Sequence, residues 1–200
     1  MDLVEQQNKQ IDFIVANNFW AVKDLSVLEL GPQAGDFFTK KLLDIASSVA
    51  CIELDPGAID ALDQQTFRNK IKLVQDDFHD AVKTVGQFDA VVIYGVLYHS
   101  PAPLKLIEDI VNFVKPKIIL LETQHEGYFI SLADENNNVS GMRQHQLKSC
   151  GISLIVGMDI YKKALSNLGY SELQRCQVPA DNDNGFFKSG WLHSIFKLNP

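Results

Sequence analysis

Two acidic residues and two glycines carry the clearest chemical signal in this chain. The apolar run that contains Glu29 leads into Gly31 and then Gly35. Gly31 can take the positive φ that a sharp strand-to-helix turn often needs, and Gly35 lets a helix or a ligand approach closely. Glu53 closes the next apolar run, where a nucleotide-binding α/β fold presents an acid to ribose hydroxyls. We therefore predict that the chain binds an adenosine-containing cofactor.

Two histidines could supply acid–base chemistry at one rim of the fold. His99 follows a predicted strand at 90–94, and His125 follows another at 117–122. An unperturbed histidine titrates near neutral pH, so either side chain could remove a proton from an acceptor. Both also have a structural interpretation, since His99 could cap the next helix or hold its loop, and His125 could equally be structural.

Length and hydropathy indicate an ordinary globular protein. The 200 residues suffice for one domain with a substantial core, and we take 1–200 as that domain. No apolar run approaches the roughly 18 residues that cross a bilayer, and the polar first residues do not resemble a signal peptide. We therefore expect a cytoplasmic protein with no membrane partner.

Charge and cysteine usage narrow the choice of partner. The formal net charge of −7 argues against broad nucleic-acid binding, which needs a basic surface. The three cysteines are widely spaced and form no CxxC pair, so neither a zinc knuckle nor a redox pair is indicated. His125 and the acids near it follow no ligand-spacing rule, and we predict no metal site. A small-molecule substrate remains the expected partner, whereas the oligomeric state is not indicated.

Short apolar runs alternate with helical patterns over much of the chain. A helix at 3–19 dominates the N-terminal segment 1–24. The strands that we predict after it are 26–30, 49–54, 71–75, 90–94 and 117–122, and the helices between them are 35–45, 56–65, 78–85 and 104–114. This alternation is typical of a parallel sheet with helices on both faces and right-handed crossovers.

The rhythm changes after residue 122. Residues 123–149 are polar and rich in Asn, Gln and His. A long irregular segment inside a compact domain is usually functional or mobile, so we predict that 123–158 forms a lid or substrate segment. A helix at 159–168 follows, and strands at 172–178 and 191–198 with no helix between them predict an antiparallel hairpin at the edge of the sheet.

Four segments resemble, in order and spacing, the class I S-adenosylmethionine-dependent methyltransferases. They are residues 27–35, 52–56, 74–78 and 88–99, each at a predicted strand end. Each segment alone is a weak signal, but four in the right order argue against chance. The resemblance implies S-adenosyl-L-methionine as cofactor. It also implies an α/β, three-layer Rossmann-like sandwich, whose seven-stranded, mostly parallel sheet has an antiparallel C-terminal strand.

The resemblance implies roles for the first two strand ends. The backbone at Gly31, Gln33 and Gly35 would lie under the amino-acid part of the cofactor, and Glu29 would orient this part directly or through water. Glu53 would accept hydrogen bonds from both ribose hydroxyls, as a carboxylate with two oxygens can.

The next two strand ends would hold the adenine and the methyl group. By the same resemblance, Asp77 would accept a hydrogen bond from the adenine amine, while Leu54 and Phe78 would sandwich the ring. Tyr94 and Gly95 would border the methionine part and the methyl group. Asp77 could instead be a turn residue, as could the neighbouring Asp76.

Gln33 is the main departure from the family's pattern. It occupies the position where the glycine loop usually has a third glycine, so its side chain could crowd the cofactor or hydrogen-bond to it. The same substitution argues against a dehydrogenase, because the dinucleotide fingerprint G-x-G-x-x-G needs glycines where this chain has Gln33 and Asp36.

We therefore expect a methyltransferase that acts on the O, N or C atom of a small molecule. One alternative is a tRNA-modifying enzyme, because residues 95–100 with 103–104 resemble the tRNA wobble-uridine carboxymethyl transferases. Another is an S-adenosylmethionine-binding protein without catalysis. The residues leave both alternatives open.

Overall fold

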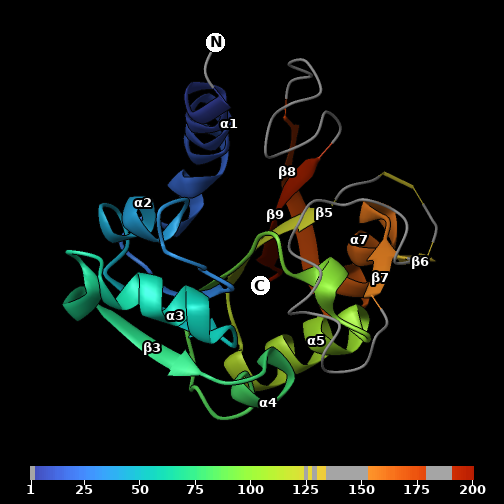
Figure 1. The fold of residues 1–200 in the computed structure, drawn as a ribbon. Coiled ribbons are helices and arrows are strands. Elements are labelled where there is room, and N and C mark those ends of the chain that lie inside the picture. Colours follow the sequence, from blue (N-terminus) through green and yellow to red (C-terminus); the bar gives the residue numbers. More distant parts are fainter. Residues whose placement is uncertain (1–2, 124–125, 128–129, 134–152, 179–190) are drawn as a thin grey trace.

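A seven-stranded sheet runs through the centre of the protein (Figure 1). The structure, a computed structural model, describes residues 3–123, 126–127, 130–133, 153–178 and 191–200. The strand order is β3-β2-β1-β4-β5-β9-β8. β1 to β5 pair in parallel, whereas β9 pairs antiparallel with both β5 and β8. The strands are β1 Ser26–Leu30, β2 Ser48–Glu53, β3 Ile71–Gln75, β4 Ala90–Ile93, β5 Ile118–Thr123, β8 Tyr170–Gln177 and β9 Leu192–Leu198. The fold class predicted from the sequence is confirmed.

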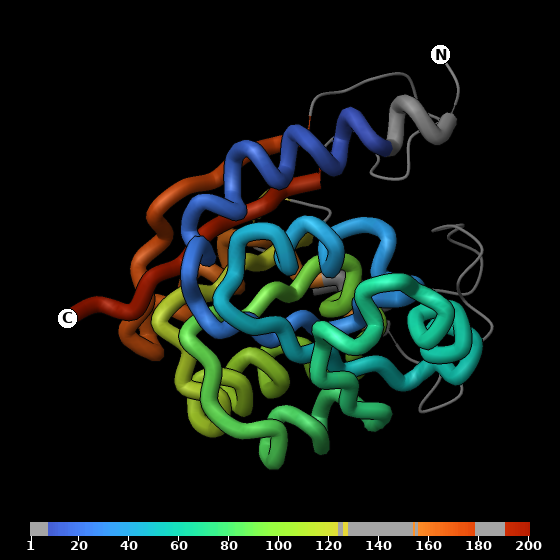
Figure 2. Tube along the Cα trace, turned by 90° about the vertical axis from the view of Figure 1, so that its left-hand side faces the viewer, coloured from blue at the N-terminus to red at the C-terminus, as the bar shows by residue number. Residues whose placement is uncertain are grey.

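Helices cover both faces of this sheet and complete three layers (Figure 2). One face packs against α1 Leu3–Asn18, η1 Phe19–Val22, α2 Thr39–Leu43 and α3 Pro56–Asp63. The other face packs against α4 Phe78–Ala81, α5 Pro103–Asp109, η4 Ile110–Val114 and α7 Met158–Asn167. Two short helices, η2 Arg68–Lys70 and η3 Leu97–His99, lie in the connections.

Alternation along each strand decides which helical layer a side chain meets. In β1, Leu28 packs with the α4, α5 and α7 layer, whereas Val27 packs with the α1 to α3 layer. Because successive strand residues point to opposite faces, Glu29 points to the same side as Val27. By the same alternation along β2 and β5, the side chains of Glu53 and Glu122 point toward the layer of α1 to α3. Three acids near the carboxyl ends of parallel strands thus share one face.

The connection after β1 is less helical than the sequence predicts. We expected a helix at 35–45, but α2 covers only Thr39–Leu43. The Gly35 N–H donates to the carbonyl of Pro32 at 2.9 Å, and Gly35 has a φ of +77°. That turn has a left-handed backbone, which an α-helix cannot include. The residues ahead of α2 therefore form a loop rather than a helical turn.

The segment after β5 contains regular structure that the sequence analysis missed. β6 Ile130–Ala133 and β7 Ser153–Val156 form a two-stranded antiparallel sheet, so the prediction of an irregular segment over 123–149 is wrong at β6, and β7 is a strand that was not predicted. The Thr123 hydroxyl donates to the carbonyl of Val156 at 2.7 Å, and Leu154 N–H donates to the carbonyl of Ser100 at 3.4 Å. β7 therefore lies against the carboxyl end of β5 and the connection after β4.

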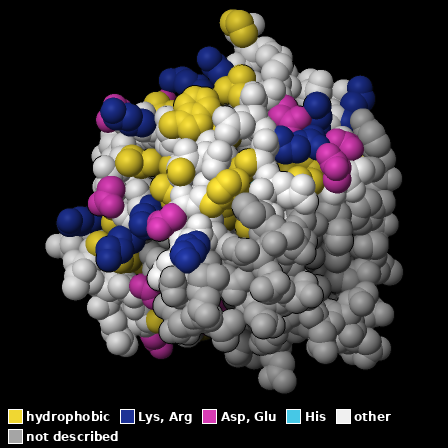
Figure 3. All heavy atoms as spheres, turned by 90° about the horizontal axis from the view of Figure 1, so that it is seen from above, with side chains coloured by type: hydrophobic (Ala, Val, Ile, Leu, Met, Phe, Trp, Pro, Cys, Tyr) yellow, Lys and Arg dark blue, Asp and Glu magenta, His cyan; other side chains and the backbone are white. Residues whose placement is uncertain are grey.

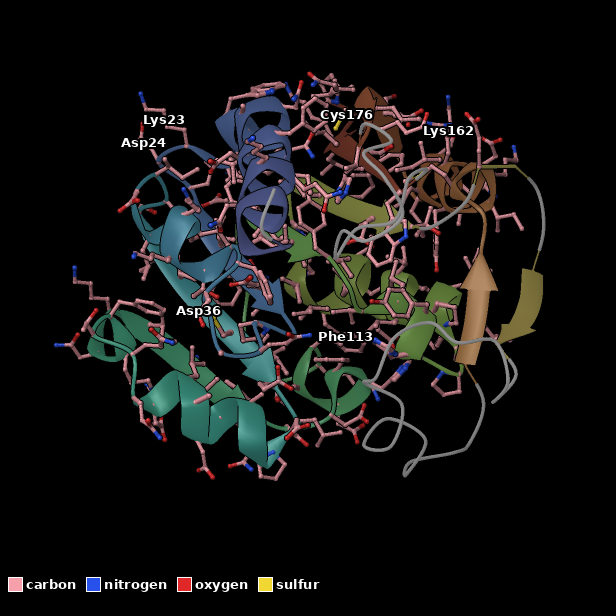
Figure 4. The ribbon with its side chains drawn as sticks, turned by 45° about the horizontal axis from the view of Figure 1, so that its top comes forward. Lys23, Asp24, Asp36, Phe113, Lys162 and Cys176 are labelled. Carbon is pink, nitrogen blue, oxygen red and sulfur yellow. The ribbon has the colours of Figure 1, made fainter. Side chains whose placement is uncertain are left out.

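Buried polar contacts fix the end of α1 against the sheet. Asn18 is fully buried, and its Nδ2 donates to the Tyr94 hydroxyl at 3.1 Å. Its Oδ1 lies 3.6 Å from the sulfur of Cys176 on β8. Figure 4 shows Cys176 on the strand beside α1. Figure 2 also shows α1 running alongside β8 and β9. Because Tyr94 directly follows β4, Asn18 joins the first helix to both the centre and the edge of the sheet.

We expect Asn18→Ala to lower the free energy of unfolding by about 1–3 kcal/mol, because it leaves the buried Tyr94 hydroxyl without its donor. Chemical denaturation measures this change. Asn17→Ala is the matched control, since the Asn17 side chain donates only to Phe13 within its own helix. An equal effect of the two substitutions would contradict the anchoring role of Asn18.

Candidate active site

The carboxyl ends of β1, β4 and β5 line a pocket that is partly open to solvent. Its walls combine loop backbone, aromatic rings and two carboxyl groups, and its lining residues are Glu29, Leu30, Gly31, Pro32, Gln33, Phe37, Phe38, Tyr94, Gly95, Tyr98 and Glu122. The structure thus brings together five of the residues that the sequence analysis assigned to the cofactor, namely Glu29, Gly31, Gln33, Tyr94 and Gly95. Open α/β sheets bind their ligands at this edge.

The loop after β1 takes a left-handed backbone at every second residue. Gly31, Gln33 and Gly35 have φ values of +66°, +52° and +77°. A Cβ atom on Gly31 would lie 2.9 Å from Val96 Cγ2, and one on Gly35 would lie 2.6 Å from a methyl group of Leu62. Both glycines are therefore required by conformation and by space. Gln33 holds the same conformation with a side chain, which costs conformational energy.

Glu53 holds this loop through its carboxylate. One oxygen accepts hydrogen bonds from Leu54 N–H at 2.9 Å and Asp55 N–H at 3.0 Å, and the other accepts from Gln33 N–H at 3.1 Å. A carboxylate has about four acceptor sites, so these three bonds leave room for a ligand hydroxyl. Asp55 itself caps α3 by accepting from Gly57 N–H at 2.7 Å, as its position before Pro56 suggested.

Glu29 is buried beneath the pocket. Its Oε2 accepts from the Thr39 hydroxyl at 2.7 Å, which joins β1 to the first residue of α2, and it lies 3.8 Å from the Cys51 sulfur. Burial raises the pKa of Glu29 from its ordinary value of 4.5 to about 7. A side chain near half ionisation at neutral pH can accept a hydrogen bond or donate one to a ligand.

The residues predicted to hold adenine lie at the end of β3 and after β2. Asp77 caps α4, because its Oδ1 accepts from His79 N–H at 2.8 Å. This oxygen therefore has the local structural role that the sequence analysis gave as the alternative to binding adenine. The Phe78 ring lies close to Gly31, so it reaches the glycine loop. Leu54 is 47% exposed, which is unusual for a leucine next to a buried strand and provides an open apolar surface.

Tyr94 sits within a cluster of aromatic rings. It is buried, and its ring lies 5.1 Å from that of Phe38 and 4.9 Å from that of His193, both edge-on. Because its hydroxyl accepts from Asn18, Tyr94 serves packing as well as lining the pocket. Gly95 follows it with a φ of +71°.

Glu122 is the site residue that the sequence analysis missed as a pocket residue. It is 2% exposed, and its Oε2 accepts from Gly95 N–H at 3.0 Å. Its Oε1 has no hydrogen-bond partner among the residues that the structure describes. Burial raises the pKa of Glu122 to about 8. The signal was present in the sequence, because Glu122 ends an apolar strand just as Glu29 and Glu53 do.

His99 lies in η3, beside the pocket rather than in its lining. Its ring packs on Tyr98 at 4.1 Å between centroids, and Tyr98 does line the pocket. Burial lowers the pKa of His99 to about 4, so the imidazole is neutral at pH 7 and a weak base. Its catalytic role stays a prediction. His125 lies outside the described residues.

Comparisons with known proteins agree with this geometry. Residues 28–121 match the profile of a methyltransferase domain. Comparison of the sequence with curated proteins gives no significant match. No helix in the described part of the chain is long and apolar enough to span a membrane.

Solved structures resemble the whole chain at low sequence identity. The N-methyltransferase NodS from Bradyrhizobium japonicum WM9, bound to S-adenosyl-L-homocysteine, has a TM-score of 0.66 and 19% identity over 98% of this chain and 87% of its own. The 1,6-didemethyltoxoflavin-N1-methyltransferase of Burkholderia thailandensis has a TM-score of 0.66 and 13% identity over 98% of this chain and 79% of its own. The methyltransferase domain of bacterial CtHen1 has a TM-score of 0.64 and 18% identity over 98% of this chain and 99% of its own.

The sheet order, the glycine loop and the strand-end acids define a Rossmann-like nucleoside-binding enzyme fold. Together with the domain match, they make the chain a class I S-adenosylmethionine-dependent methyltransferase, as its motifs predicted. S-adenosyl-L-methionine is its cofactor.

We expect Gln33→Gly to raise the free energy of unfolding by roughly 0.5–1 kcal/mol. The left-handed backbone costs a side-chain-bearing residue about 1–2 kcal/mol, and the greater freedom of glycine in the unfolded chain offsets part of the gain. Gln33→Ala keeps the strain, so it should bring no gain in chemical denaturation. If Gln33→Gly and Gln33→Ala lowered the free energy of unfolding equally, the contacts of the Gln33 side chain would stabilise the protein by more than its backbone strain costs.

We expect the cofactor-free protein to lose stability between pH 6.5 and 8. The folded Glu122, with a pKa of about 8, binds a proton that the unfolded chain, with an ordinary pKa of 4.5, has released. Stability therefore falls as pH rises, by roughly 1–2 kcal/mol over this window. Glu29, with a pKa of about 7, adds a change of the same sign. The lowered pKa values of His99 and His193 act in the opposite direction, mainly below pH 6.5, and offset part of the loss at the lower end of this window.

Glu122→Gln keeps the shape of the side chain and removes this titration. Denaturation at several pH values should give a flatter profile for the variant, with the remaining slope due to Glu29. Identical profiles for variant and wild type would show that Glu122 is already ionised in the folded protein.

Proposed function

We propose that this methyltransferase acts on a small-molecule acceptor. The pocket carries the proposal: among the residues that the structure describes, its lining is aromatic and acidic and contains no lysine or arginine. A polyanionic acceptor such as a nucleic acid needs cations near its phosphates. A compact acceptor without negative charge fits this pocket better.

The remaining surface supports the same acceptor class. The net charge is −7, and the face in Figure 3 shows basic side chains interspersed with acidic and apolar ones rather than gathered into one patch. Two of the structural neighbours are named as N-methyltransferases, one of them for a small heterocycle. These neighbours support the proposal, although they share only the fold with this chain.

The cofactor's parts can be assigned to residues whose geometry suits them. The left-handed loop of Gly31, Gln33 and Gly35 leaves the backbone bare for the amino-acid part, with Glu29 beneath it. Glu53 has one acceptor site to spare and would receive the second ribose hydroxyl if one of its three backbone bonds were shared or given up on binding. The cofactor supplies a methyl group already activated on a positively charged sulfur, so the protein's task is to bind, orient and deprotonate.

The adenine ring and the methyl group of the cofactor can be assigned to residues in the same way. Leu54 and Phe78 would hold the adenine ring, with Asp77 at its amine. Tyr94 and Gly95 would border the methyl group. For an acceptor that must lose a proton, His99 and His125 are the bases that the sequence favours.

Two assays test this function together. S-adenosylhomocysteine formation across a panel of small amines, phenols and carboxylic acids should show turnover with a small molecule. Turnover with tRNA, accompanied by salt-sensitive binding, would instead support the tRNA-modifying alternative.

We expect Glu53→Ala to weaken binding of S-adenosylhomocysteine by roughly 5–150-fold, or 1–3 kcal/mol, because it removes a charged acceptor and the anchor of the glycine loop. Titration calorimetry measures the affinity, at a temperature where denaturation shows the variant folded. Asp55→Asn is the matched control, since an asparagine can still cap α3. Unchanged affinity in Glu53→Ala would mean that the ribose assignment is mistaken.

A further inference from the structure

We propose that Glu122 binds the acceptor, and that the acceptor presents an amine to it. This inference rests on the proposed small-molecule function and names the chemical class of its substrate. It also assigns Glu122 as a catalytic residue, because its free oxygen would touch the reacting nitrogen.

The hydrogen bonds of Glu122 leave one buried oxygen for a ligand. Oε2 is held by Gly95 N–H at 3.0 Å, at the residue expected to border the methyl group. Oε1 is buried and has no partner among the described residues, although Glu122 lines the pocket. Buried polar atoms are nearly always hydrogen-bonded in native proteins, so an unpaired one in a pocket wall indicates a ligand group.

The other two acids of this face accept more hydrogen bonds from the protein than Glu122 does. Glu29 receives the Thr39 hydroxyl, and Glu53 receives three backbone N–H groups. Glu122 lies on β5, which is separated from β1 by β4, so Tyr94 and Gly95 stand between it and the glycine loop. This position places it on the acceptor side of the residues that border the methyl group.

The walls around Glu122 favour a positively charged nitrogen. Phe37, Phe38, Tyr94 and Tyr98 supply aromatic rings to the pocket, and aromatic faces attract organic cations. A carboxylate that accepts from an ammonium forms a charge-assisted hydrogen bond, stronger than a neutral one. An anionic acceptor would meet two carboxyl groups and, among the lining residues that the structure describes, no compensating cation.

The proposed step conserves atoms and charge. The Glu122 carboxylate takes one proton from the acceptor ammonium, which leaves an amine with a free lone pair. That lone pair forms the new N–C bond to the methyl group, while the C–S bond breaks and its electron pair stays on sulfur. The products are a methylated ammonium, S-adenosylhomocysteine and protonated Glu122, which then returns its proton to water.

Proton release on binding follows from the surroundings of Glu122. Among the described residues, the titratable groups that face it are Glu29, Tyr94 and Tyr98 across the pocket and His193, its partner in the β5–β9 ladder. Burial lowers the pKa of His193 to about 3, so that ring is neutral at pH 7. With no cation among these groups, Glu122 holds a proton at pH 7 and would lose it when an ammonium binds.

Calorimetry of the protein saturated with S-adenosylhomocysteine tests the inference without turnover. The probes are benzylamine and methylamine, with benzyl alcohol and methanol as neutral compounds of the same shape. Titration at pH 7 in two buffers of different ionisation enthalpy measures proton release. We expect an amine to bind at least about tenfold more tightly than its alcohol, with release of up to about one proton.

Glu122→Gln should abolish both the proton release and the preference for the amine, while its affinity for S-adenosylhomocysteine stays unchanged. Glu126→Gln is the matched control, because Glu126 is an exposed glutamate that pairs with Arg175 outside the pocket lining. It should behave as the wild type.

Several outcomes would overturn the inference. They are equal binding of amine and alcohol, no saturable binding of either amine, or unchanged proton release in Glu122→Gln. Weaker cofactor-product binding in that variant would assign Glu122 to the cofactor instead. Failure of the wild type to bind S-adenosylhomocysteine would be a failure of the proposed function and not of this inference alone.

Discussion

The site depends on the hydrogen bonds that the Glu53 carboxylate accepts from the backbone. Gln33 N–H from the glycine loop meets one oxygen, while Leu54 and Asp55 N–H groups from the start of the next connection meet the other. A loop with three left-handed residues has little local stability of its own. One buried acid thus ties two strand ends together, and the pocket takes its shape from that tie.

Three strand-end acids share a sheet face, yet their surroundings give them different chemistry. Glu53 is held by backbone donors and Glu29 by the Thr39 hydroxyl, whereas Glu122 accepts a single N–H and its other oxygen has no partner in the part of the chain that the structure describes. Burial without compensating cations raises the pKa of Glu29 and Glu122. Glutamate therefore has three different roles at this site. Glu53 holds the glycine loop, Glu29 is a titratable group beneath the pocket, and Glu122 has an oxygen that an acceptor could bind.

Where sequence prediction failed, tertiary contacts outweighed local pattern. The helix expected at 35–45 is shortened because the turn at Gly35 serves the loop, and α2 begins where Thr39 can reach Glu29. β6 and β7 have only four residues each and pair across a long gap in sequence, so neither gives a period long enough to detect. The prediction for His99 is a separate case, because its ring packs on Tyr98 beside the pocket lining and its catalytic role stays a prediction.

The sequence by itself determined the order of the main strands, the glycine positions and the cofactor class, because these follow from hydrophobic runs and from local backbone requirements. It also marked Glu29 and Glu53 by their places at strand ends. Only the tertiary structure decided that Glu122 lines the same pocket as Glu29 and that Asn18 donates to the Tyr94 hydroxyl. It also decided which acid has an oxygen with no partner among the described residues. Hydrogen-bond satisfaction and desolvation depend on neighbours distant in the chain, and no local pattern encodes those neighbours.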